Sequence, residues 1–222
     1  MIRVNNHIIR YFYIKYMICS YLFDPQKFAK GCVIESMKKM YVHMAPQSTL
    51  DELTAACEQA ATAACDALCV PQWFVAPAAA ALKEKGVAVA TIVGLPGGTT
   101  TSSAKYAEAK QAVANGAGIV IVPMNLELCK TDAGAAKNDF VASAAPVKKH
   151  GKRLWTLIDA ACLTAEQTVT AAGLGIAAGA ELALLANADD ALMDRLAKAN
   201  IPAGTFGKAT AAPSALCASA EL

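Results

Sequence analysis

The residues best suited to chemistry lie in a loop rich in glycine and threonine, GLPGGTTT, at residues 94–101. It follows the apolar run VAVATIV and leads directly into a helix-like segment, SSAKYAEAKQAV. In α/β enzymes a loop at the carboxyl end of a buried strand is the usual place for a ligand. Such a loop could present backbone N–H groups to an anion at the start of the helix, and it could equally be a turn that ends in a helix cap. The candidate residues are Gly97, Gly98, Thr99 and Thr100.

A second candidate is the carboxylate of Asp159, which follows the apolar run RLWTLI. We expect it to make a hydrogen bond at the end of its strand, because general acid–base catalysis needs a partner that this stretch does not supply. His43 and His150 have no cysteine or acidic residue at metal-ligand spacing. Both are therefore predicted to be surface residues, and no metal site is expected.

The cysteines favour a reducing compartment. The chain has eight, and most stand inside apolar helical or strand patterns, without the paired spacing of a secreted disulfide scaffold. We therefore predict buried free thiols and a cytoplasmic location, with no cofactor implied. Zinc is disfavoured because no histidine accompanies Cys65 and Cys69, which are four residues apart. The cysteines inside apolar patterns are Cys57, Cys65, Cys69, Cys129 and Cys162.

Composition indicates one folded domain. The chain has 222 residues, of which 55% are hydrophobic and 17% charged, so it must bury a large apolar surface. The formal net charge is only +2, and the lysines are scattered. Nucleic acid is therefore not expected as a partner, because such proteins gather basic residues into a stripe or patch.

Residues 1–31 differ from the rest of the chain. They hold four of the six tyrosines and a single alanine. Lys15 interrupts the apolar run YFYIKYMICSYLF, and no cleavage site of small residues follows, so a secretory signal is disfavoured. The run is also too short and too charged to cross a bilayer, and no membrane association is expected. We interpret 1–31 as an extension of atypical composition and 32–222 as the domain.

The domain alternates strand-like and helix-like segments. Six such units imply a parallel sheet, either doubly wound or closed into a barrel. Because neither GxGxxG nor GxxxxGK[ST] occurs, a (β/α)₈ barrel is favoured. The last 20 residues could hold one more short strand, which leaves open whether the barrel is complete at its C-terminal end. Strands are expected at 39–44, 67–70, 87–93, 118–124, 153–158 and 181–185, and helices at 49–64, 74–85, 102–115, 135–151, 164–178 and 189–200.

The segment TIVGLPGGTTTSSAKYAEAKQAVANGAG resembles the third-strand signature of deoxyribose-phosphate aldolase, a class I aldolase with a TIM (β/α)₈ barrel. The resemblance covers roughly residues 45–187. It includes IDAACLT at 158–164, and it places Asn125 where the family has a fourth-strand asparagine, which makes Asn125 a pocket candidate. In register are Gly94, Pro96, Gly98, Thr100, Lys105, Glu108, Ala109, Gly116 and Ala117.

The resemblance implies cleavage of 2-deoxyribose 5-phosphate through a lysine Schiff base, supported by a second lysine and an aspartate. The three family positions align here with Trp155, Leu184 and Ile121. We therefore expect a divergent aldolase-like protein without catalytic residues. Trp155 is interpreted first as a space-filler and alternatively as an aromatic platform for a ligand. The family's phosphate loops have no clear counterpart beyond Gly204, Gly207 and Lys208.

The function expected is that of a pseudoenzyme, a cytoplasmic scaffold that binds another protein through its outer surface. Glycolytic aldolases on the same barrel bind cytoskeletal filaments, and only this analogy points to such a partner. A homo-oligomer is also open, because a short barrel would leave strand edges to be covered. The alternative function is a lyase that retains deoxyribose-phosphate aldolase or a related aldol activity.

Overall fold

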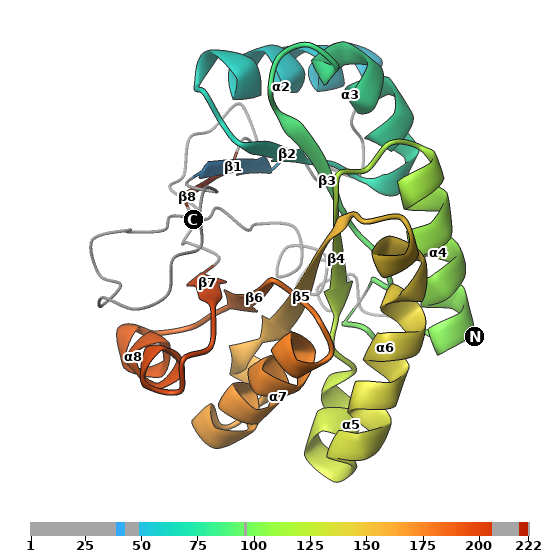
Figure 1. The fold of residues 1–222 in the computed structure, drawn as a ribbon. Helices are drawn as coiled ribbons and strands as arrows, with labels where there is room; N and C mark the ends of the chain where they lie inside the picture. The colour runs from blue at the N-terminus through green and yellow to red at the C-terminus, as the bar shows by residue number, and fades with distance from the viewer. Residues whose placement is uncertain (1–38, 43–48, 96, 206–217, 222) are drawn as a thin grey trace, which may run out of the picture.

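A computed structural model describes residues 39–42, 49–95, 97–205 and 218–221. The strands form one curved sheet, and the helices lie along its convex side (Figure 1). The order across the sheet is β7-β6-β5-β4-β3-β2-β1-β8. The strands are β1 (Lys39–Val42), β2 (Ala67–Cys69), β3 (Ala88–Ile92), β4 (Ile119–Pro123), β5 (Arg153–Asp159), β6 (Leu182–Ala186), β7 (Ala203–Thr205) and β8 (Ala218–Glu221).

Neighbouring strands from β1 to β7 pair in parallel and in chain order. This confirms the α/β fold of TIM-barrel type. The C-terminal stretch holds two strands where the sequence indicated room for one, and β8 pairs antiparallel with β1. Both are short and built mostly from small residues, so they lack the apolar run that marks a buried strand. A full eighth βα unit is not present in the described residues.

Helices fill the connections between the strands. They are α2 (Leu50–Thr62), α3 (Val75–Leu82), α4 (Ser102–Ala114), α5 (Leu126–Thr131), α6 (Ala133–Lys149), α7 (Ala165–Ala177) and α8 (Asp190–Lys198), with the 3-10 turns η2 (Gln72–Phe74) and η3 (Ala160–Cys162). All six expected helices are present, and α5 is additional. Thr164 and Gln167 form the capping box that their spacing predicts, and Thr49 and Glu52 form another.

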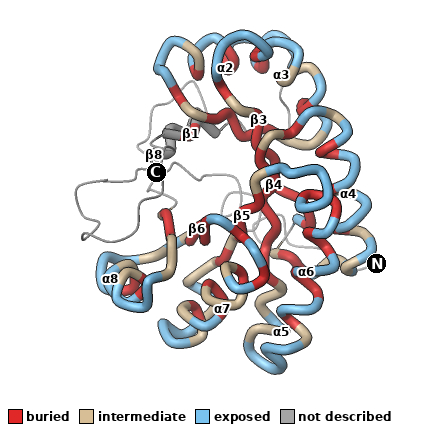
Figure 2. The backbone as a smooth tube through the Cα atoms, viewed as in Figure 1, coloured by how far each residue is buried: buried red, intermediate tan, exposed pale blue. Residues whose placement is uncertain are grey.

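The strands from β2 to β7 are largely buried (Figure 2) and carry packed side chains on both faces. On its convex face, residues such as Val120, Ile158 and Leu185 pack against the helices. Successive strand residues point to opposite faces, so the alternate set faces the concave side. There the buried side chains form a second apolar cluster, which we call the interior cluster: Met40, Ala67, Cys69, Ala90, Ile92, Ile119, Ile121, Trp155, Leu182 and Leu184.

The sequence predicts buried cysteines, and Cys57, Cys65 and Cys69 are buried; Cys57 and Cys69 are free thiols. Cys129 is only partly buried and Cys162 is exposed. The expectation of burial was wrong for Cys162 because η3 carries it at the surface instead of continuing the apolar strand. Among the described residues, no helix is long and apolar enough to cross a membrane. The predictions for residues 1–31 and for His43 lie outside the described residues.

Candidate functional site

Hydrogen bonds from α4 fix the start of the loop at residues 94–101. The Gly94 N–H donates to Glu108 Oε2 at 2.6 Å, and Gln72 Nε2 donates to the same oxygen at 2.9 Å. Gly94 has a φ of +68°, in the left-handed region that favours glycine. A single carboxylate therefore ties the loop after β3 to the turn after β2.

The centre of the loop rests on the end of β4 and on a buried lysine. A Cβ on Gly98 would lie 2.6 Å from the Met124 carbonyl oxygen, so only glycine fits there. Lys105 is fully buried; its Nζ donates to the Gly98 carbonyl at 3.0 Å and forms an ion pair with Asp139. Ser102 Oγ donates to Asp139 Oδ1 at 2.6 Å. The side chain of Lys105 thus holds the backbone of the loop in place.

The loop ends in a helix cap, which was one of the two predictions for it. Thr101 is the N-cap of α4, and its side chain accepts from the Ala104 N–H at 3.3 Å. Thr100 Oγ1 is buried and finds no hydrogen-bond partner in the described part of the chain. Anion binding by Gly97, Gly98 and the threonines stays a prediction, because no structural observation tests it.

Asn125 and Asp159 both cap local structure. Asn125 Oδ1 accepts from the backbone N–H groups of the first turn of α5, at 3.2 and 3.3 Å. Asp159 Oδ1 accepts from the Ala161 N–H at 3.0 Å and from Asn187 Nδ2 at 2.7 Å. The expected hydrogen-bonding role of Asp159 at the end of β5 is therefore present. Asn187 was not expected at the site. It lies directly after β6 with a φ of +57°, a turn conformation that asparagine tolerates, so an asparagine at the end of an apolar run was the available sequence signal.

The three positions aligned with the family's catalytic residues all lie in the interior cluster. Trp155, Leu184 and Ile121 are each fully buried. Ile121 pairs with Trp155 across β4 and β5, and Leu184 pairs with Leu157 across β5 and β6. Three strands therefore bring these apolar side chains to one region of the concave face.

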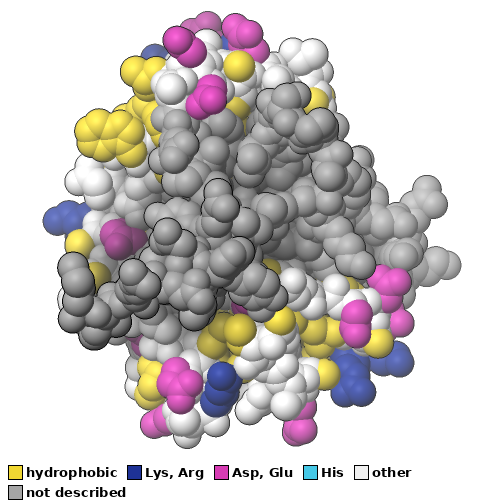
Figure 3. Space-filling view, turned by 180° about the vertical axis from the view of Figure 1, so that it is seen from behind, with side chains coloured by type: hydrophobic (Ala, Val, Ile, Leu, Met, Phe, Trp, Pro, Cys, Tyr) yellow, Lys and Arg dark blue, Asp and Glu magenta, His cyan; other side chains and the backbone are white. Residues whose placement is uncertain are grey.

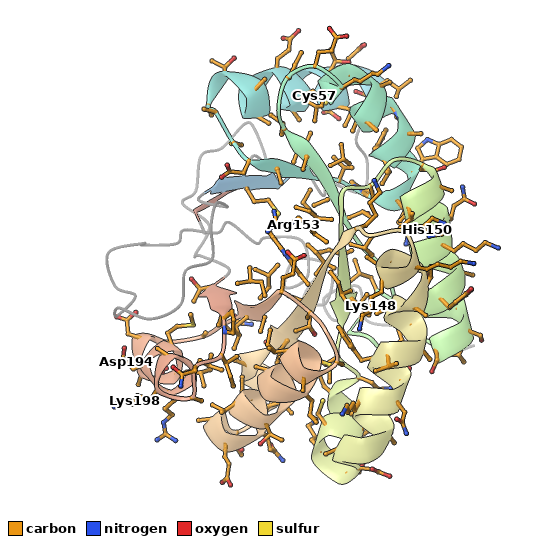
Figure 4. All side chains as sticks on the ribbon, viewed as in Figure 1. Cys57, Lys148, His150, Arg153, Asp194 and Lys198 are labelled. Atoms are coloured by element: carbon orange, nitrogen blue, oxygen red, sulfur yellow. The ribbon has the colours of Figure 1, made fainter. Side chains whose placement is uncertain are left out.

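Trp155 fills space in this cluster. Its ring is fully buried, and its Nε1–H finds no acceptor among the described residues. The guanidinium of Arg153, labelled in Figure 4, lies 5.4 Å from the ring centroid, and its Nε donates to Glu181 Oε2 at 2.8 Å. Arg153 is at the amino-terminal end of β5. The burial supports the space-filling interpretation over an open aromatic platform.

Burial also changes the acidity of two thiols. It raises the pKa of Cys69, in the interior cluster, to about 12. It raises the pKa of Cys129 to about 11, with a further contribution from Asp139 that Lys105 opposes. Both thiols are therefore neutral at physiological pH, so neither supplies a thiolate nucleophile.

Comparison with known proteins identifies the family. The model of the DeoC/LacD family aldolases matches residues 30–183. The chain belongs to this aldolase family. Deoxyribose-phosphate aldolase of Streptococcus equi subsp. zooepidemicus is 39% identical over 137 residues, which are 61% of this chain and 60% of that protein. Deoxyribose-phosphate aldolase 1 of Bacillus licheniformis is 32% identical over 152 residues, 66% of this chain and 67% of that protein.

Solved aldolases share the fold of this family member. A protein assigned as a deoxyribose-phosphate aldolase from Coccidioides immitis superposes with a TM-score of 0.70 at 20% identity, over 92% of this chain and 85% of its own. Deoxyribose phosphate aldolase from Aeropyrum pernix, titled a unique tetrameric structure, gives 0.66 at 16% identity, over 74% and 72%. The chain spans about three fifths of the length of the first curated relative.

Proposed function

We propose that this chain is a non-catalytic member of the DeoC/LacD aldolase family. One observation carries the proposal: the described side chains that line the concave face of β4, β5 and β6 between the strand ends include no amine. Schiff-base chemistry needs a lysine whose neutral amine can reach the sugar carbonyl. The side chains concerned are Ile119, Ile121, Trp155, Leu157, Leu182, Leu184 and Ala186.

A shifted alignment does not place a lysine in the interior. A shift of two residues stays on the same face, because side chains alternate along a strand. From Trp155 it reaches Leu157 or Arg153, whose guanidinium is not a Schiff-base amine, and from Ile121 and Leu184 it reaches only apolar residues. A shift of one residue reaches the convex face, where Val120, Thr156 and Ala183 are equally without an amine. No lysine occurs anywhere in β4, β5 or β6.

Lys105 does not replace the missing amine. It is the one fully buried lysine of the described residues, and it belongs to α4, outside the sheet. Its Nζ forms an ion pair with Asp139 and donates a hydrogen bond to the Gly98 carbonyl. An ammonium group in a buried ion pair has no lone pair with which to attack a carbonyl.

The function that remains is binding, and we propose a cytoplasmic scaffold that engages another protein through its outer surface. The family's barrel is a stable support that serves unrelated roles, so keeping the fold does not require keeping the reaction. A cytoskeletal filament is a partner by analogy alone.

The direct test is an enzyme assay with 2-deoxyribose 5-phosphate. We expect acetaldehyde release to stay at the level of buffer, while the Aeropyrum pernix enzyme at the same concentration consumes the substrate. Turnover that rises in proportion to the concentration of this protein would instead support the alternative, a lyase that retains aldol activity. The triple variant Trp155→Lys, Leu184→Lys, Ile121→Asp then measures whether activity can be restored in the same barrel.

A further inference from the structure

Exposed hydrophobic side chains follow the carboxyl ends of β1, β2 and β3 in the chain. Trp73, in η2 after β2, is 84% exposed; Leu50, the first residue of α2, is 60% exposed; and Leu95, in the loop after β3, is 42% exposed. These strands are parallel neighbours, so their carboxyl ends lie at one edge of the sheet. Tyr106, in the second turn of α4, adds a fourth exposed side chain. We call Leu50, Trp73, Leu95 and Tyr106 the Trp73 rim.

The Trp73 rim is built on an ordered support. Gln72 and Gly94, the residues directly before Trp73 and Leu95, both donate hydrogen bonds to Glu108 Oε2. Phe74, on the other side of Trp73, is buried and anchors the turn in the core. A backbone that is already held in place loses little conformational entropy when a partner docks on it.

The exposure of Trp73 is unusual for its residue type. Tryptophan is highly buried on average, and scattered exposed leucines need no explanation, whereas a group of apolar residues around an exposed indole marks an interaction surface. Tryptophan and tyrosine are also the residue types that most often dominate binding energy at protein interfaces.

Acidic residues lie close to the rim in the chain, and the exposed Lys110 lies one turn after Tyr106 on α4. Asp51 and Glu52 are exposed in the first turn of α2, and Glu108 lies in the second turn of α4. In the described loops after β1–β3 and the first two helical turns that follow, the single cationic side chain is Lys105, which is buried in its ion pair. Figure 3 shows hydrophobic and acidic side chains at the upper end of the molecule, with Lys or Arg side chains among them.

We propose that the Trp73 rim is the docking surface for a partner segment that presents apolar side chains between lysine and arginine residues. The charge of the rim selects this chemistry, because opposite charges around an apolar centre steer association and fix the register of the partner. A second copy of the chain does not fit, because a two-fold interface would set these carboxylates against their own copies. This inference rests on the proposed binding function and names the partner's chemistry.

The test selects peptides from a random 12-residue display library on the immobilised full chain. We expect the enriched peptides to combine aromatic or aliphatic residues with a net positive charge. Their affinity for Trp73→Ala should fall at least tenfold. It should stay unchanged for the matched control Val141→Ala, which alters a 42% exposed residue on α6 that is not part of the rim. Binding should also weaken with added salt.

Three results would overturn the inference: no enrichment, enriched peptides that bind Trp73→Ala as well as the unchanged protein, or enriched peptides with net negative charge. A blue shift of the Trp73 emission with rising protein concentration alone would also overturn it, because that shift reports a second copy on the rim. None of these results bears on the aldolase assay, so failure here is distinct from failure of the non-catalytic proposal.

Discussion

The buried pair of Lys105 and Asp139 offers the sharpest stability test of the structure. In Lys105→Met, the Ser102 hydroxyl, at 2.6 Å, is the side-chain donor that remains to the Asp139 carboxylate among the described residues, and the Gly98 carbonyl loses its donor. Removing one partner from a buried pair typically costs about 3–5 kcal/mol. Because Ser102 still stabilises the charge, we expect a loss of about 3 kcal/mol in the free energy of unfolding. Asp139→Leu should cost a similar amount, since it leaves an unpaired ammonium.

The double variant Lys105→Met, Asp139→Leu should be less damaged than either single variant. It removes both charges and leaves only the Ser102 hydroxyl and the Gly98 carbonyl without partners, which together cost about 2 kcal/mol. The loss in the double variant should therefore fall short of the sum of the single losses by about 4 kcal/mol.

Urea unfolding followed by tryptophan fluorescence measures all three variants. Lys130→Met is the control, because Lys130 lies 4.0 Å from Glu127 with both side chains solvent-exposed. It should change the unfolding free energy by less than about 0.5 kcal/mol. The structural reasoning is refuted if Lys105→Met costs less than about 1 kcal/mol, or if the two single losses add to the double loss.

Three further predictions concern the loop, the interior cluster and pH. Gly98→Ala should lower the unfolding free energy, measured by urea titration, by at least about 1 kcal/mol more than Gly86→Ala. Both glycines have a φ of +71°, but of the two only position 98 would bring an added Cβ within 4 Å of neighbouring atoms. Equal losses in the two variants would contradict the packing around Gly98. In the same assay the unfolding free energy should fall by about 3–5 kcal/mol in Trp155→Ala and by less than about 0.5 kcal/mol in Trp73→Ala. A larger loss for Trp73→Ala would contradict the burial of Trp155 and the exposure of Trp73. The raised pKa of Cys69 keeps its thiol neutral in the folded state, whereas the unfolded thiol ionises above pH 9, so the free energy of unfolding falls as pH rises from 9 toward about 12. Between pH 8 and pH 10 the unfolding free energy of Cys69→Ala should therefore fall by about 1.4 kcal/mol less than that of the unchanged protein. Parallel pH curves for the two proteins would refute this prediction.

The fold was largely readable from the sequence because its strands and helices carry strong local signals. Apolar runs such as residues 118–124 mark strands that are covered on both faces, and the Thr164 capping box marks a helix start. The helix α5 was not expected, because six residues in a polar segment show no periodic pattern and depend on the Asn125 cap. The C-terminal stretch indicated one more short strand, and the second of β7 and β8 was missed because both are built mostly from small residues.

The site was less predictable because its contacts join residues far apart in the chain. Lys105 and Asp139 are 34 positions apart, and only the packing of α4 against α6 brings them together. Glu108 likewise joins two loops that no local pattern connects. The family signature placed Lys105 and Glu108 in register, but it carried no information on what their side chains hold.

The most direct test of the central claim is borohydride trapping of a Schiff base with 2-deoxyribose 5-phosphate, read by intact-protein mass. Reduction would convert an imine on any lysine into a stable adduct, whatever its position in the chain. The non-catalytic proposal predicts an unchanged mass under conditions in which the Aeropyrum pernix aldolase is labelled. A stoichiometric adduct on one lysine of this chain would contradict it.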